Sequence, residues 1–102
     1  MKNKLALSVR QPYAEQIING TKTIEYRSRS TNIRGSIFIY ATLKTYNGVS
    51  AGNLQRGLII GTVEIHDCKK VGSSYHWLLR NPRRINSIKP SKQPQPVFFK
   101  PF

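Results

Sequence analysis

Four stretches of the chain place their apolar residues as β-strands do, alternating on one face or filling both faces. They are residues 4–10, 22–27, 36–42 and 57–67. In the second stretch, Ile24 and Tyr26 fall on one face, while Glu25 and Arg27 fall on the other. Residues 36–42 are apolar on both faces, which favours a strand that is buried on both sides.

A short amphipathic helix is predicted at residues 12–19, between the first two strands. Pro12 suits the first helical turn, where its missing N–H leaves no hydrogen bond unmade. Gly20 suits the position after the helix, where a left-handed conformation costs glycine little. The apolar face of this helix carries Tyr13, Ala14, Ile17 and Ile18. We therefore expect a strand–helix–strand unit at the start of the fold.

The middle of the chain is less regular. Residues 44–56 predict a loop or a short irregular helix. Residues 73–79 predict a second short helix, because Ser73 and Ser74 can cap it, and Pro82 would end it. Residues 83–90 predict a further strand. Four of the six prolines lie from position 90 onward, but three Phe residues there indicate that this tail docks as an edge strand.

These elements predict one α+β domain over residues 1–102, with about five to six strands and two or three short helices. The single cysteine, Cys68, excludes an internal disulfide and is typical of a reducing compartment. The apolar run at residues 5–7 is too short for a signal peptide, and no stretch approaches a membrane span. We expect a soluble, cytoplasmic protein.

The charge of the chain changes this picture most. Seventeen Lys and Arg residues against four Asp and Glu give a formal net charge of +13. So large an excess in a small domain predicts an anionic partner such as RNA or DNA. No long basic amphipathic helix favours a membrane surface instead. The last 23 residues hold six bases and no acid, which predicts a second basic surface.

Candidate chemistry is concentrated in residues 20–27, where Glu25 lies between Lys22 and Arg27. Lys22 suits a phosphate contact or acid–base chemistry, and Glu25 suits its orientation or a general base. A plain strand would separate positions 22 and 25, so their convergence requires a turn after Gly20. Arg27 shares the face of Glu25 and is placed to pair with it. The structural alternative is a surface ion pair, worth about 0–1 kcal/mol.

Further candidate contacts to nucleic acid flank this motif. Most are generic phosphate contacts beside the predicted helix start or in neighbouring loops, and the tyrosines suit base stacking. They are Arg10, Gln11, Tyr13, Arg27, Arg29, Arg34 and Lys44, with Tyr26 as a further stacking candidate. Glu64 would be a second carboxylate beside Lys22 if its strand face looks into the same cleft. His66 and Cys68 lack a complete ligand set, so neither a metal nor another cofactor is predicted.

The chain resembles the ASCH domain family in two consecutive motifs. These are Ser8-x-Arg10-Gln11-Pro12-Tyr13-Ala14 and the G-x-K-x-x-E-x-R pattern of residues 20–27. Further similar stretches are residues 35–42, 60–65, 75–77 and 98–99. The resemblance implies a small PUA-like β-barrel with a cleft lined by the second motif. It also implies RNA binding, with DNA as the other possible partner.

The same resemblance keeps an enzyme open as the alternative function. ASCH-like proteins include a bacterial ribonuclease and an amidohydrolase that removes the acetyl group from N4-acetylcytidine. For a ribonuclease, Glu25 would be the base and Lys22 the charge stabiliser. The amidohydrolase branch has Thr at the position of Glu25, so this chain departs from its pattern. The two readings differ in whether Glu25 lies free in the cleft or is paired with Arg27.

Overall fold

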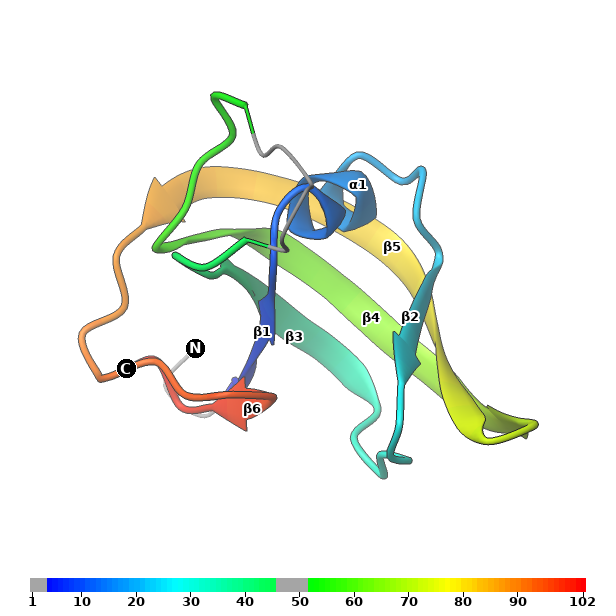
Figure 1. The fold of residues 1–102 in the computed structure, drawn as a ribbon. Helices are drawn as coiled ribbons and strands as arrows, with labels where there is room; N and C mark the ends of the chain where they lie inside the picture. The colour runs from blue at the N-terminus through cyan, green and yellow to red at the C-terminus, as the bar shows by residue number, and fades with distance from the viewer. Residues whose placement is uncertain (1–3, 46–51) are drawn as a thin grey trace.

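The computed structural model describes residues 4–45 and 52–102, which form six strands and one helix. In chain order these are β1 (Ala6–Val9), α1 (Tyr13–Ile18), β2 (Ile24–Arg27), β3 (Gly35–Ala41), β4 (Leu58–Val71), β5 (Ser74–Ile88) and β6 (Phe98–Phe99). The strands make one sheet in the order β2-β5-β4-β3-β1-β6. The sheet curls strongly, and α1 lies across one end of it (Figure 1).

The edges of the curled sheet are not joined by backbone hydrogen bonds. β1 runs parallel to β3, every other strand pair is antiparallel, and the edge strands β2 and β6 do not pair. One side chain bridges the opening: Arg27 of β2 donates from Nη2 to the Ser8 carbonyl of β1, at 3.0 Å. The barrel expected from the sequence is therefore wrong, because the sheet is curled but open. Its six strands agree with the predicted five to six.

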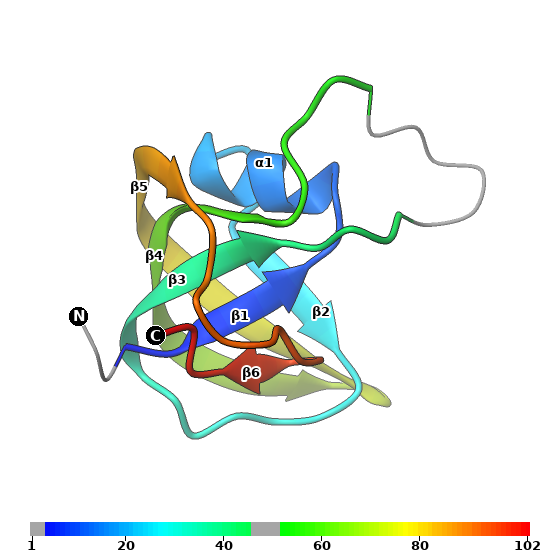
Figure 2. The ribbon, with the colours of Figure 1, turned by 90° about the vertical axis from the view of Figure 1, so that its left-hand side faces the viewer.

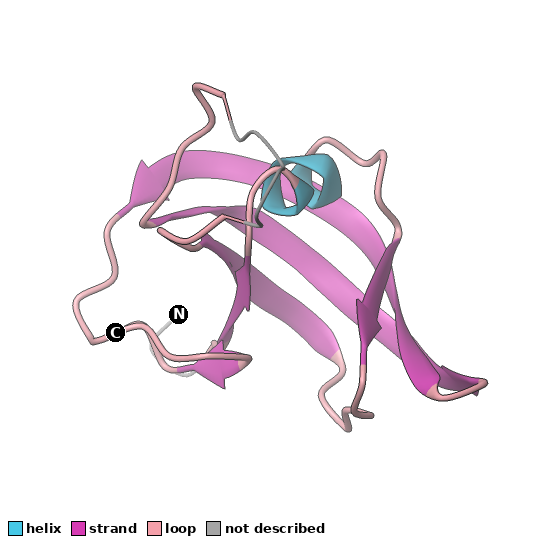
Figure 3. Cartoon of the chain, in the orientation of Figure 1, coloured by secondary structure: helices cyan, strands magenta, loops and turns pink. Residues whose placement is uncertain are grey.

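The predicted helix at residues 73–79 is wrong, and α1 is the one helix in the part of the chain that the structure describes (Figure 3). Val71 pairs with Ser74, so Gly72 and Ser73 form a two-residue hairpin turn between β4 and β5. Gly72 has φ +62°, which glycine adopts at little cost. The strand predicted at 83–90 is the continuation of β5. The loop predicted at 44–56 falls partly outside the described residues, and its described parts contain no helix or strand.

The main core lies between α1 and the concave side of the sheet. Ile17 and Ile18 of the predicted apolar helix face are buried there with Trp77 of β5. A smaller cluster joins Tyr40 to Phe99, whose rings meet edge to face with centroids 5.4 Å apart. Because burying Phe99 holds β6 against β1, the prediction of a docked edge strand is confirmed.

Val97, just before β6, has a strained backbone with φ +62°. A left-handed conformation costs a β-branched residue about 1–2 kcal/mol, and glycine little. Val97 is 41% exposed, so its replacement loses little apolar burial. We expect Val97→Gly to raise the free energy of unfolding by about 1 kcal/mol, measured by urea denaturation. Val71→Gly, at a similarly exposed position with ordinary strand backbone, should lower it; an equal loss in both variants would contradict the strain.

Candidate nucleic-acid interface

A cleft of about 1120 Å³ opens beside the unpaired edge of the sheet. Its walls come from β2, from the ends of β1 and β3, from residues 56–57 and from residues 89–97. Its charged lining residues are six bases, Arg10, Arg27, Lys44, Arg56, Lys89 and Lys92, and one acid, Glu25. This excess of cations makes the cleft a suitable place for a polyanion.

The wall at residues 89–97 is built by the return of the chain toward β1. Figure 2 shows this segment running from the end of β5 to β6. Ser8 fixes it twice, because its N–H donates to the Val97 carbonyl at 2.8 Å and its hydroxyl donates to the Gln95 carbonyl at 2.7 Å. The return brings Lys89 and Lys92 to the cleft that contains Arg27. The second basic surface predicted for the C-terminal residues thus joins the first in part.

Glu25 is buried, with 7% of its surface exposed, and its carboxylate is paired with neighbouring cations. Arg27 donates from Nε to Oε2 at 2.8 Å, and its Nη2 lies 2.6 Å from the same oxygen. The Lys22 ammonium lies 3.7 Å from Oε1. Gly20, with φ +87°, makes the turn that brings Lys22 back to the carboxylate. The convergence expected after Gly20 is present, and Glu25 is held by both neighbouring cations.

Lys22 faces a second, smaller hollow of about 260 Å³. Its ammonium lies 4.7 Å from the ring centroid of Tyr26 and 5.5 Å from that of Tyr13, within cation–π range. Only 15% of the Lys22 side chain is exposed. Tyr26 lines both the cleft and this hollow, whereas Lys22 and Tyr13 line only the hollow. The motif therefore supplies one wall to each of two adjacent depressions.

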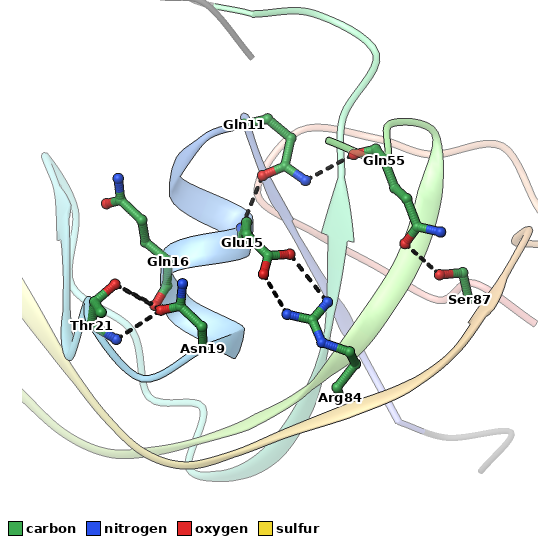
Figure 4. A network of polar contacts seen from close by, with 8 residues as sticks. All are labelled: Gln11, Glu15, Gln16, Asn19, Thr21, Gln55, Arg84 and Ser87. Atoms are coloured by element: carbon green, nitrogen blue, oxygen red, sulfur yellow. Dashed lines mark hydrogen bonds and ion pairs between the residues drawn. The ribbon is translucent and has the colours of Figure 1, made fainter. Parts of the chain in front are cut away.

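Gln11 is fully buried and serves the scaffold. Its Nε2 donates to the Gln55 carbonyl at 2.8 Å, and its Oε1 accepts the N–H of Glu15 at 2.9 Å (Figure 4). Because both ends of the amide are used, we leave Gln11 out of the interface. The anion site expected at the start of α1 lacks donors, because the N–H groups of its first turn already bond to the Arg10 carbonyl and to Gln11. Arg10 itself lines the cleft.

Two other predicted contacts lie outside the cleft lining. Arg34 donates from Nη1 to the carbonyls of Thr31 and Ile33, at 2.9 Å each, and so stabilises its own loop. Arg29 is exposed, and its carbonyl accepts the indole N–H of Trp77 at 2.9 Å. Lys44 does line the cleft, as predicted. The cleft-lining cations that were not predicted from the sequence are Arg56, Lys89 and Lys92.

Glu64 lines neither the cleft nor the hollow that contains Lys22, so it is no second carboxylate beside Lys22. It faces Arg80 across β4 and β5, with Oε1 2.6 Å from Arg80 Nη2, and it accepts a bond from Asn81. These hydrogen bonds, from Arg80 first, lower the pKa of the Glu64 carboxyl below its ordinary value. Glu15 pairs in the same way with Arg84 (Figure 4). The C-terminal bases are thus partly neutralised by acids from earlier strands and α1.

Tyr40 lies on the cleft wall and is 5% exposed, in keeping with its predicted place in the core. Burial raises the pKa of its phenol above the ordinary value, so the hydroxyl stays protonated at neutral pH.

Within residues 4–45 and 52–102, no three His, Cys, Asp or Glu side chains gather to hold a metal ion. No helix in these ranges is long and apolar enough to cross a membrane.

An open, curled six-stranded sheet with one short helix and a basic cleft is the architecture of a PUA-like domain. The ASCH domain model matches residues 7–93, and the chain therefore belongs to the ASCH family. ASCH domains are PUA-like domains that generally bind nucleic acids. The family predicted from the two N-terminal motifs is thus confirmed.

Solved structures of the ASCH protein from Zymomonas mobilis share the fold. The unsubstituted protein is 18% identical, with a TM-score of 0.70 over 98% of this chain and 88% of its own. One single-substitution variant, also 18% identical, gives 0.71 over 97% and 88%. Another gives 0.70 at 18% identity over 98% and 90%. No curated protein matches the chain.

Proposed function

We propose that this ASCH domain binds RNA in the basic cleft, with DNA as the other nucleic acid to be tested. One observation carries the proposal: six cations and one acid line the cleft, and that acid is already paired with Arg27. The other three acids of the chain are also engaged, Glu15 and Glu64 with arginines and Asp67 with the Cys68 N–H. The cleft therefore carries a net positive charge, which favours the binding of phosphates.

Lys89 and Lys92 give the sharpest test, because both are exposed and both line the cleft. We expect Lys89→Ala/Lys92→Ala to weaken the binding of a labelled single-stranded RNA by about tenfold at low salt. The slope of log K against log salt should fall by about one for each lost phosphate contact. Fluorescence anisotropy at a series of salt concentrations measures both quantities.

Lys69→Ala/Lys70→Ala is the matched control, because it removes the same charge from exposed positions of β4 that do not line the cleft. Its affinity should stay within about twofold of the wild type, since only long-range attraction is lost. Equal weakening by both pairs would mean that charge alone, and not the cleft, governs binding. Single-stranded DNA of the same sequence shows whether the 2′-hydroxyl contributes.

The geometry gives the catalytic alternative less support. A general base needs a carboxylate that can accept a proton, but Glu25 is buried and held by Arg27 and Lys22. Oε2 contacts Arg27 and Oε1 faces Lys22, so both oxygens of this carboxylate are already engaged. RNA from the binding assay is therefore expected to be recovered uncleaved, and N4-acetylcytidine unchanged. Product that disappears in Glu25→Gln would instead assign an enzyme.

A further inference from the structure

Tyr26 is the exposed aromatic residue that separates the cleft from the smaller hollow. It lies on the outward face of β2, is 58% exposed and lines both depressions. Its ring is held in place by its neighbours: the Lys22 ammonium lies 4.7 Å from its centroid, and the His76 ring meets it edge to face at 4.8 Å. An exposed ring with a fixed orientation loses little conformational entropy when it binds a ligand.

We propose that Tyr26 is a stacking platform for one unpaired base of a single-stranded nucleic acid whose backbone follows the cleft. This inference rests on the proposed function and names the form of its ligand. Phosphates would lie along the cations of the cleft, and the base would turn outward over β2 onto the tyrosine. The hollow beside Tyr26 gives the neighbouring base room, with Thr21 and Gln16 as polar contacts at its wall.

The shape of the site favours a single strand over a duplex. Proteins read duplexes by inserting a protruding helix or β-ribbon into a groove, or by gripping the outer backbone. Here the charges line a concave space, with Tyr26 at its margin. Bases are available for stacking on an aromatic side chain only where they are unpaired, and such stacking tolerates any base sequence.

The alternative is a structural role, in which Tyr26 only shields Lys22 and Glu25 from water. The two roles differ in what a substitution changes. Tyr26→Phe keeps the π-face and the shielding, Tyr26→Leu keeps much of the shielding without the π-face, and Tyr26→Ala removes both. A thermal melt reports the folded state of each variant. Val71→Ala is the matched control, because Val71 is an apolar residue that is 48% exposed and lines neither the cleft nor the hollow.

The test uses one sequence as single-stranded RNA, single-stranded DNA and duplex RNA, each carrying one 2-aminopurine whose fluorescence falls when it stacks. Tyr26→Ala and Tyr26→Leu should weaken single-strand binding by about 5- to 150-fold and abolish the quenching. Tyr26→Phe and Val71→Ala should keep the quenching and stay within about twofold in affinity. Duplex RNA should bind more weakly and be unaffected by Tyr26. A fall in 2-aminopurine fluorescence on binding of either single strand supports the stacking platform. The comparison of the two strands shows whether the ligand is RNA or DNA.

Two outcomes would overturn the inference. In the first, Tyr26→Ala and Tyr26→Leu retain wild-type affinity and quenching while Lys89→Ala/Lys92→Ala loses binding; the cleft function then stands without the stacking. In the second, duplex RNA binds as tightly as the single strand and is weakened equally by Tyr26→Ala, so Tyr26 does not select an unpaired base. If neither the lysine pair nor Tyr26 affects binding, the proposed function fails as well.

Discussion

Arg27→Ala is expected to lower the free energy of unfolding by about 2–4 kcal/mol, somewhat less than for a fully buried ion pair. The substitution removes the Nε hydrogen bond and the Nη2 ion pair to the buried carboxylate of Glu25, and leaves Glu25 with Lys22 at 3.7 Å. It also removes the donor that reaches the Ser8 carbonyl across the open edge of the sheet. Urea denaturation measures the loss. The fluorescence of the buried Trp77, over whose ring Arg27 lies, reports the unfolding.

Two further variants separate charge from packing. Arg27→Lys keeps the charge but cannot make the same pair of contacts, so we expect it to recover only part of the stability. Adding Glu25→Gln to Arg27→Ala removes the uncompensated charge, and the double variant should be more stable than Arg27→Ala alone. If Arg27→Ala costs less than about 1 kcal/mol, the pair is no stronger than an ordinary surface salt bridge.

Gly61→Ala is the second substitution with a large expected effect, a loss of about 3 kcal/mol or more in stability. A Cβ at this position of β4 would lie 2.3 Å from the Arg83 carbonyl oxygen and 2.8 Å from Cδ1 of Ile18. The Ile18 side chain can rotate away. The carbonyl belongs to β5, so relief there requires the two strands to separate.

Gly72→Ala provides the control for Gly61→Ala. Gly72 has open space around its Cβ position but a positive φ, so alanine should cost only about 1–2 kcal/mol there. Adding Ile18→Ala to Gly61→Ala should restore little, because the contact with the Arg83 carbonyl remains. Thermal and urea unfolding of the three variants and the wild type measures these differences. A Gly61→Ala protein as stable as the Gly72→Ala protein would show that β4 and β5 separate easily.

Local patterns in the sequence predicted most of the strands and the single helix. The alternation in residues 22–27 correctly placed Glu25 and Arg27 on one face, which the 2.6 Å contact confirms. The predicted helix at 73–79 failed because serine capping was given more weight than the Gly72-Ser73 pair, a typical two-residue hairpin turn. Once that turn forms, residues 74–79 pair with β4, and the β-prone Tyr75 and Trp77 fit the sheet.

The composition of the cleft depends on long-range contacts that no local pattern contains. Lys89 and Lys92 line the same cleft as Arg27 only because the chain returns to β1 and pairs Phe98 with Leu7. Sequence reasoning recognised their charge but assigned it to a separate surface. Gln11 shows the opposite error, because a polar residue in a motif was expected to be exposed, whereas its amide is fully buried and bonded at both ends.

The short pairing of β6 with β1 has a kinetic consequence. It joins Ala6 to Phe99, across nearly the whole described chain, through only two residues of strand. Contacts between such distant residues close late in folding, because they pay the largest loop-closure entropy. β6 also packs on both clusters, because the Phe98 ring stacks on Trp77 with centroids 5.6 Å apart and Phe99 is buried with Tyr40. The wall at residues 89–97 leads into this strand, so the cleft takes its final shape only once β6 has paired with β1.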